Sequence, residues 1–153
     1  MAYESTEVVV SKSQDQIRKL IYAHKGTGLM LLSQPPREGF EAMVTIGDMP
    51  YHIRIMATAN PRVHDKWGMK LSGGRLDAVL EQENRRVWRV LFWHLKAMFE
   101  ASDSGVIDVR DVIMPYVVMR DGLTIADHVK PKMQELMTCD PSRLLTSSSK
   151  ETQ

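Results

Sequence analysis

The sequence predicts an α+β fold in which a small antiparallel sheet, made of a hairpin and flanking strands, packs against a long amphipathic helix and shorter helices. Two segments, Phe40–Ile46 and Tyr51–Ala57, alternate apolar and polar residues on either side of Gly47-Asp48-Met49-Pro50, which is the pattern of a β-hairpin. The stretch Leu76–Ala101 instead repeats apolar residues at helical spacing. Because strands and helices do not alternate regularly along the chain, a doubly wound parallel sheet is excluded.

The composition agrees with a single globular domain. The 153 residues are 43% hydrophobic and 25% charged, which excludes disordered, collagen-like and fibrous classes. A single cysteine excludes a disulfide framework and a cysteine-based metal cluster. We expect residues 1–145 to form one α+β domain and residues 146–153, which include three consecutive serines, to form a disordered tail.

No segment has the pattern of a membrane span or a secretory signal. The apolar runs are far shorter than the roughly 18–20 residues that a transmembrane helix needs. The first residues include Glu4 and Glu7, where a secretory signal would carry basic side chains. We therefore expect a cytoplasmic protein with no membrane partner.

The first helix is expected to follow a short strand over Val8–Val10. Ser13 and Gln16 have the spacing of a capping box, in which each side chain satisfies a free backbone N–H at the helix start. Gly26 is expected to end the helix by adopting the left-handed conformation. The apolar face of this helix consists of Ile17, Leu20, Ile21 and His24.

A strand over Leu29–Ser33 precedes the hairpin and ends at two prolines, which cannot donate to a sheet. One face of the hairpin is apolar. The polar residues on its other face, which we expect to meet solvent or a partner, are Glu41, Thr45, His52 and Arg54.

A loop of about fifteen residues, Asn60–Gly74, follows the hairpin. Loops of that length in compact domains are usually functional or flexible.

The remaining chain is predicted to be mostly helical. The long helix ends at Asp103-Ser104-Gly105. After it, in order, we expect a short helix over Asp108–Met114, a strand over Pro115–Met119, and a last helix that is capped by Thr124 and runs to about Met137 with a kink at Pro131.

Charge is distributed unevenly along the chain, although the formal net charge is only +1. Residues 52–96 carry 9 basic and 4 acidic side chains, whereas residues 97–129 carry 2 basic and 6 acidic ones. The basic segment could attract an anionic partner. Alternatively, the two segments face each other and pair within the molecule.

The long helix has two different faces. A helical wheel places Leu80, Val87, Trp88, Leu91, Phe92, Leu95, Met98 and Phe99 on the core face. The opposite face holds Trp93 together with Arg85, Arg86, Arg89, Lys96 and Glu100. Cations interleaved with an aromatic ring are typical of proteins that bind single strands, because cations neutralise phosphates while the ring stacks on a base.

These residues lead to two hypotheses. In the first, the protein binds DNA or RNA through Arg85, Arg86, Arg89, Trp93 and Lys96, and the loop residues Lys66, Trp67 and Lys70 form the other wall of a groove. In the second, Trp93, Val90 and the exposed arm of the hairpin bind protein, either a second copy of the chain or a host factor. Glu81 and Glu100 lie four residues from Arg85 and Lys96, so part of the basic patch is expected to be neutralised locally.

The sequence gives no positive evidence for an enzyme. Its five histidines include no pair at metal-ligand spacing, so we predict no metal site and no cofactor. Ser72-Gly73-Gly74 lacks the frame of a phosphate-binding loop, and Cys139 has no basic neighbour in sequence that would activate its thiol. A pocket that brings His52 or His94 beside an acidic residue would reopen the question.

Four stretches carry a resemblance: Ser11-Lys12-Ser13-Gln14 with Ile17-Arg18, the segment Tyr51–Ile55, the segment Trp88–Gly105 and the segment Asp121–Asp127. In these the chain resembles a group of small, largely uncharacterised proteins encoded by bacteriophages and prophages, notably of actinobacterial hosts. The resemblance implies a phage-encoded protein that acts in the bacterial cytoplasm, and it does not indicate an activity. Together with the basic and aromatic helix face, it leads us to expect a non-enzymatic accessory protein of phage DNA metabolism or takeover. The resemblance supplies no functional residues.

Overall fold

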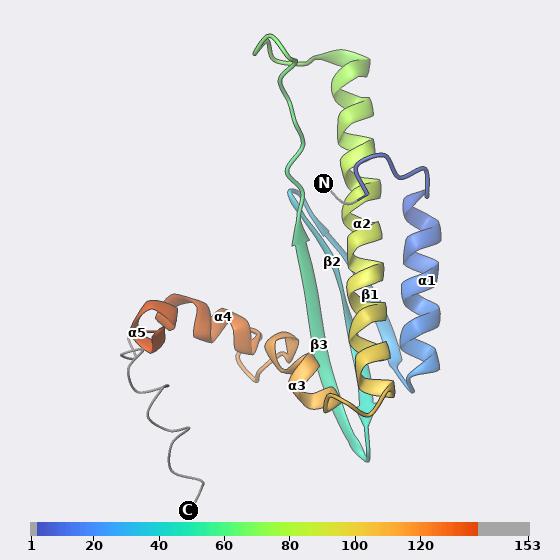
Figure 1. The fold of residues 1–153 in the computed structure, drawn as a ribbon, viewed down its shortest axis with the longest axis vertical. Helices are drawn as coiled ribbons and strands as arrows, with labels where there is room; N and C mark the ends of the chain where they lie inside the picture. Colours follow the sequence, from blue (N-terminus) through green and yellow to red (C-terminus); the bar gives the residue numbers. More distant parts are fainter. Residues whose placement is uncertain (1–2, 138–153) are drawn as a thin grey trace, which may run out of the picture.

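The structure is a computed structural model, and it describes residues 3–137. Its three strands form one antiparallel sheet in the order β1-β2-β3, and α1 and α2 lie side by side on one face of that sheet (Figure 1). The predicted α+β class is confirmed. The elements are α1 (Val10–Ala23), β1 (Thr27–Gln34), β2 (Arg37–Ile46), β3 (Met49–Thr58), α2 (Gly73–Asp103), α3 (Val109–Ile113), the 3₁₀ turn η1 (Met114–Tyr116), α4 (Ile125–Val129), the 3₁₀ turn η2 (Lys130–Lys132) and α5 (Met133–Met137).

The predicted hairpin is formed by β2 and β3. Phe40 pairs with Ile55 and Ala42 with Ile53, so the apolar residues of both strands face the helices. The connection is shorter than predicted, because Ile46 already pairs with Met49 and leaves only Gly47-Asp48 as the turn. Gly47 has a φ of +60°, which a two-residue hairpin turn often requires and glycine adopts without strain.

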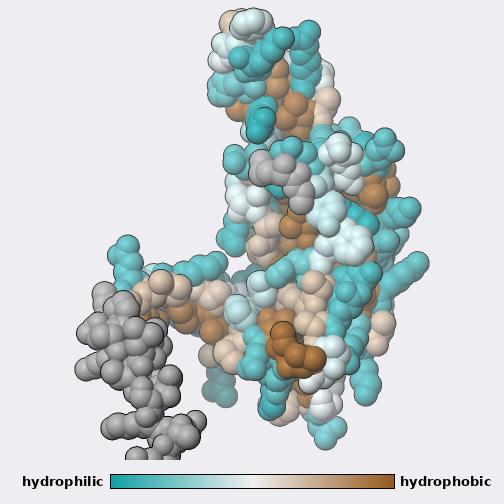
Figure 2. All heavy atoms as spheres, in the orientation of Figure 1, coloured by the Kyte–Doolittle hydropathy of each residue, from teal (hydrophilic) through white to brown (hydrophobic). Residues whose placement is uncertain are grey.

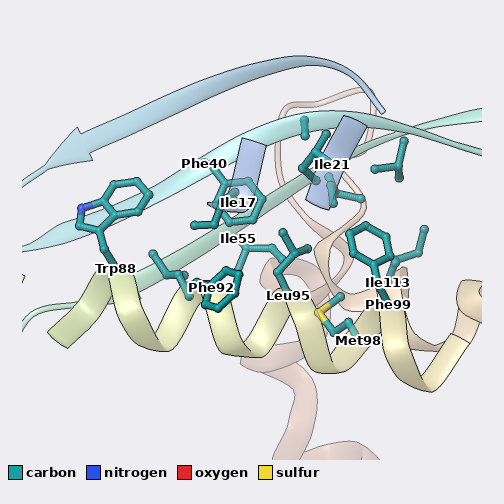
Figure 3. Packing of buried hydrophobic residues seen from close by; sticks show 14 of the residues in the cluster. Ile17, Ile21, Phe40, Ile55, Trp88, Phe92, Leu95, Met98, Phe99 and Ile113 are labelled. Atoms are coloured by element: carbon teal, nitrogen blue, oxygen red, sulfur yellow. The ribbon is translucent and has the colours of Figure 1, made fainter. Parts of the chain in front are cut away.

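The core lies between the sheet and the helices (Figure 3). Trp88 is 1% exposed and Leu95 0%, which confirms the predicted core face over most of α2. Burying each such side chain stabilises the fold by roughly 1.5–3 kcal/mol. Leu80 is an exception, with 43% of its surface exposed, because the first turns of α2 project beyond the sheet (Figure 1).

The predicted start of α1 is wrong. The helix begins at Val10, with Val9 in the N-cap position, and no side chain caps it. The expected strand over Val8–Val10 is therefore absent, and Ser13 lies inside the helix with 0% exposure. Ser13 shares the buried face of α1 with Ile17 and Ile21 at i, i+4 and i+8. Packing of this face stabilises a helix that starts at Val10, three residues before the predicted cap at Ser13.

The predicted end of α1 is at the right place but has a different cause. Lys25, not Gly26, adopts the left-handed conformation, with a φ of +57°. The Gly26 N–H donates to the Ile21 carbonyl at 2.8 Å, and the Lys25 N–H donates to the Tyr22 carbonyl at 3.2 Å, which is the Schellman pattern. Gly26 is required instead for space, because a Cβ there would lie 2.6 Å from the Ile21 carbonyl oxygen.

The C-terminal part agrees with the prediction in its helices but not in its strand. Residues 114–116 form η1, and Val117 and Val118 make only isolated bridges, to Ile53 and Thr124. Thr124 caps α4 in a capping box with Asp127, and the helical path is interrupted at η2, which contains the predicted kink residue Pro131. Within residues 3–137, no helix is long and apolar enough to cross a bilayer. The predicted tail, residues 146–153, and Cys139 lie outside the described residues.

Candidate nucleic-acid interface

Trp93 lies on the outer side of α2 and is surrounded by the predicted cations. The Arg89 guanidinium carbon lies 5.1 Å from the centre of the Trp93 ring, and the Lys96 Nζ lies 4.8 Å from it. Tyr3 is stacked nearly parallel to the indole, with ring centres 6.5 Å apart. Trp93 is consequently only 36% exposed, so its ring is partly covered by the protein itself.

The cations on α2 are mostly paired within the helix. Arg85 forms an ion pair with Glu81, and the Lys96 Nζ lies 3.4 Å from Glu100 Oε1. Both pairs have the i, i+4 spacing, so the predicted local neutralisation is confirmed. Arg89 donates to the Gln16 side chain at 2.6 Å and thereby joins α2 to α1.

Arg86 has a structural role. Its guanidinium makes two 2.7 Å hydrogen bonds to the Glu83 carboxylate, which also accepts the Asn60 N–H at 2.7 Å. The hydrogen bond from Arg86 holds the pKa of Glu83 below its ordinary value, although partial burial opposes the shift. Arg86 and Glu83 therefore fix the start of the long loop to α2.

The long loop folds into a defined hairpin over Val63–Leu71, which we call the tip hairpin. The Asp65 N–H donates to the Met69 carbonyl at 2.9 Å, and the Leu71 N–H donates to the Val63 carbonyl at 2.8 Å. The Asp65 carboxylate accepts the N–H groups of Trp67 and Met69 at 2.8 and 2.9 Å, and Gly68 turns the chain with a φ of +80°. The segment is thus an ordered turn with Trp67 at its apex.

The tip hairpin and the residues beside it present an exposed ring and four cations. Trp67 is 78% exposed, and the Lys66 Nζ lies 5.1 Å from its ring centre. Asp65 is the one acidic residue between positions 60 and 75, and its carboxylate is occupied by the turn. Among the described residues, no carboxylate lies within ion-pair distance of the four cations of this region, which are Arg62, Lys66, Lys70 and Arg75.

The two groups of predicted site residues are far apart. The tip hairpin lies near the N-terminal end of α2 (Figure 1), whereas Trp93 follows Gly73 by about 20 residues, or about 30 Å of helix. The loop therefore does not form the second wall of a groove with the Trp93 face, as the sequence suggested. The structure contains two separate aromatic and cationic patches, and the end that carries the tip hairpin is mostly hydrophilic (Figure 2).

The two oppositely charged segments pair mainly within themselves. Lys96 and Glu100 join the basic segment to the acidic one. Most of the other ion pairs of the two segments are local, such as Arg110 with Asp108, which holds the pKa of the Asp108 carboxyl at about 2. The basic charge of the tip hairpin is thus not neutralised by the acidic segment.

The sheet face opposite the helices is only partly free. Arg54 donates to Glu41 and, at 2.9 Å, to the Gly122 carbonyl, while His52 Nε2 lies 2.9 Å from the other Glu41 oxygen. The C-terminal segment crosses part of this face and leaves a cleft of about 570 Å³ beside Glu41 and Arg54. Burial raises the pKa of Glu41, but hydrogen bonds from Arg54 and His52 outweigh this effect and lower it overall.

His52 lies beside the Glu41 carboxylate, an arrangement that general acid–base chemistry also uses. Arg54 holds Glu41 as the anion, and within residues 3–137 no hydroxyl or thiol is hydrogen-bonded to His52. His94 bonds to the Tyr116 hydroxyl at 2.7 Å rather than to a carboxylate, and burial lowers its pKa. Within residues 3–137, no group of three or more acidic, histidine or cysteine side chains is placed to hold a metal ion.

Sequence reasoning did not identify Arg62, Arg75 or Tyr3 as site residues. The two arginines border the loop and belong to the basic segment, so their charge was visible, but their lack of acidic partners depends on the fold. The stacking of Tyr3 on Trp93 joins residues 90 positions apart and has no sequence signal. No family model matches the chain, and searches of curated proteins and of solved structures likewise returned no match.

Proposed function

We propose that the protein binds nucleic acid through the tip hairpin, with a preference for single strands. The observation that carries this proposal is the exposure of Trp67, 78% of whose surface is open to solvent at the apex of an ordered turn. Packing within the protein does not explain why such a large aromatic ring is exposed to water. The π face of a nucleic-acid base is a partner on which an exposed ring can stack. A single strand offers unstacked bases, whereas a duplex does not.

The charge of the tip hairpin supports the same partner. The Lys66 Nζ lies 5.1 Å from the Trp67 ring centre, and Lys70, Arg62 and Arg75 are near it in sequence. No ion pair joins any of these four cations to a carboxylate within residues 3–137, so we propose that they bind phosphates. Each phosphate that is neutralised releases counterions, which supplies affinity without sequence preference. Trp93, Arg89 and Lys96 form a second, partly covered patch that a long strand could also contact.

The proposed role is that of a non-enzymatic accessory protein. A non-enzymatic factor that coats or delivers single strands needs only an exposed ring and free cations, and both occur in the tip hairpin. The acid–base pair of Glu41 and His52 is not part of this proposal.

Fluorescence anisotropy with labelled single- and double-stranded oligonucleotides at low salt tests the proposal. Trp67→Ala should weaken single-strand binding by about 5- to 150-fold, which corresponds to the roughly 1–3 kcal/mol of one base–aromatic stack. The matched control is Leu80→Ala, which removes another exposed apolar side chain from the projecting end of α2 and should leave binding unchanged. No binding by the wild-type protein at tens of micromolar, or equal binding by Trp67→Ala, would overturn the proposal.

A second candidate function, protein–protein interaction, is favoured by a different observation. Apolar side chains are exposed on the first strand of the sheet, where Met30 and Leu31 are 53% and 37% exposed. Trp93, which the sequence suggested for such an interface together with Val90, is exposed to the same degree as Leu31, but Tyr3 stacks on its ring. We infer that the edge of the sheet at Met30 and Leu31 is a surface for a protein partner.

A further inference from the structure

The two edges of the sheet differ in how they are covered. The β3 edge is closed by the C-terminal segment, because Val117 bridges to Ile53 and the Val118 N–H donates to the His52 carbonyl at 2.8 Å. The β1 edge has no such cover: within residues 3–137, no backbone group outside β2 is hydrogen-bonded to Thr27–Gln34. Alternate N–H and C=O groups of β1 consequently point away from β2 toward solvent.

The composition of β1 does not protect this edge. Natural sheets discourage pairing at free edges with lysines, prolines within the strand, or bulges. β1 contains no charged residue and no proline, and its central four residues are Leu29-Met30-Leu31-Leu32. One bulge occurs between Thr27 and Leu29, but from Leu29 to Gln34 the strand pairs with β2 in regular register.

The exposed side chains of β1 lie on both faces of the sheet. Leu31 pairs with Phe40 and so lies on the helix-covered face, whereas Met30 pairs with Glu41 on the opposite face. Although α1 and α2 cover the first of these faces, Leu31 remains 37% exposed. A further strand beside β1 would satisfy the free backbone groups and cover side chains on both faces at once.

We propose that this strand is β1 of a second copy, paired antiparallel about a two-fold axis near Met30 and Leu31. The two sheets would then form one six-stranded sheet with the helices of both copies on the same face. Because β1 carries no charge, it cannot select a strand of another protein by charge complementarity. For the same reason, two copies of β1 can pair without like-charge repulsion. An edge that is uncharged along its whole length and apolar from Leu29 to Leu32 is complementary to its own copy, as an isologous two-fold contact requires.

Charged substitutions at Met30 test this pairing. Light scattering after size exclusion should show a wild-type dimer, whereas Met30→Lys and Met30→Glu should each be monomeric, because two like charges meet near the axis. An equimolar mixture of the two variants should form a dimer again, since the charges are then opposite. Met49→Lys is the matched control, because it places the same charge at a 61% exposed methionine away from β1, and it should remain dimeric.

Three outcomes would overturn the proposal: a wild-type protein that is monomeric up to millimolar concentration, a dimer that persists in both Met30 variants, or a mixture that stays monomeric. Circular dichroism melting of each variant separates loss of pairing from loss of folding. Hydrogen exchange adds an independent readout, because protection of the β1 amides should increase with protein concentration in the wild type and not in Met30→Lys.

Discussion

Replacing Ser13 by alanine should stabilise the protein. The Ser13 side chain is fully buried in α1, and its hydroxyl oxygen has no hydrogen-bond partner within residues 3–137. Burying an unpaired hydroxyl costs about 1–3 kcal/mol, and alanine also favours the helix by up to about 0.7 kcal/mol. The contacts of the lost oxygen offset part of this gain, so we expect a net increase of about 1–2 kcal/mol in the free energy of unfolding.

Urea denaturation and thermal melting measure this effect. For a chain of this length the gain corresponds to a rise in Tm of about 3–6 °C. Ser11→Ala is the matched control, because Ser11 lies in the same helix but is exposed, and it should change the free energy of unfolding by less than about 0.7 kcal/mol.

The sign of the Ser13→Ala effect distinguishes two starts for α1. If Ser13 were the N-cap, as its spacing from Gln16 suggested, alanine would destabilise the protein by about 0.5–2 kcal/mol. A loss of that size would refute the placement of Ser13 within a helix that begins at Val10.

Three further predictions concern the end of α1 and the open face of the sheet. Gly26→Ala should lower the free energy of unfolding by about 1–3 kcal/mol in urea denaturation, because its Cβ would meet the Ile21 carbonyl; an unchanged midpoint would contradict the packing. Lys25→Gly should raise it by about 1 kcal/mol, since it removes a left-handed lysine, and a loss would mean that Lys25 is not left-handed. Glu41 has a lowered pKa when folded, so its contribution is complete above its ordinary pKa of 4.5 and is lost as pH falls below that value. The stability difference between wild type and Glu41→Gln should therefore narrow from pH 7 toward pH 3, and a constant difference would show that the ionised Glu41–Arg54 pair does not contribute.

The spacing of apolar residues was sufficient to predict those helices and strands in which it is regular over many residues. The alternation around Phe40 and Ile55 predicts the β2–β3 hairpin because a strand with one buried face has a period of two. The spacing of Trp88 and Leu95 likewise predicts the buried face of α2. The i, i+4 pair of Lys96 and Glu100 also follows from sequence alone.

The spacing of residues was insufficient where one local sequence fits two structures and tertiary packing determines which of them forms. Ser13 fits a capping box and also fits a buried helical face, and only the presence of the core decides between them. Leu80 continues the apolar stripe of α2, yet it is exposed because the sheet ends before it. The separation of Trp67 from Trp93 depends on where the loop leaves the sheet, which no local rule determines.

The salt dependence of single-strand binding measures how many phosphates the tip hairpin and its neighbouring arginines contact. If Lys66 and Lys70 of the tip hairpin and Arg62 and Arg75 beside it each contact a phosphate, the slope of log affinity against log salt concentration should be about −3. Lys66→Ala or Lys70→Ala should each reduce the magnitude of this slope by about 0.7. Lys19→Ala, at an exposed lysine of α1, should leave the slope unchanged. A slope near zero, or an equal loss of slope in all three variants, would contradict binding through the tip hairpin.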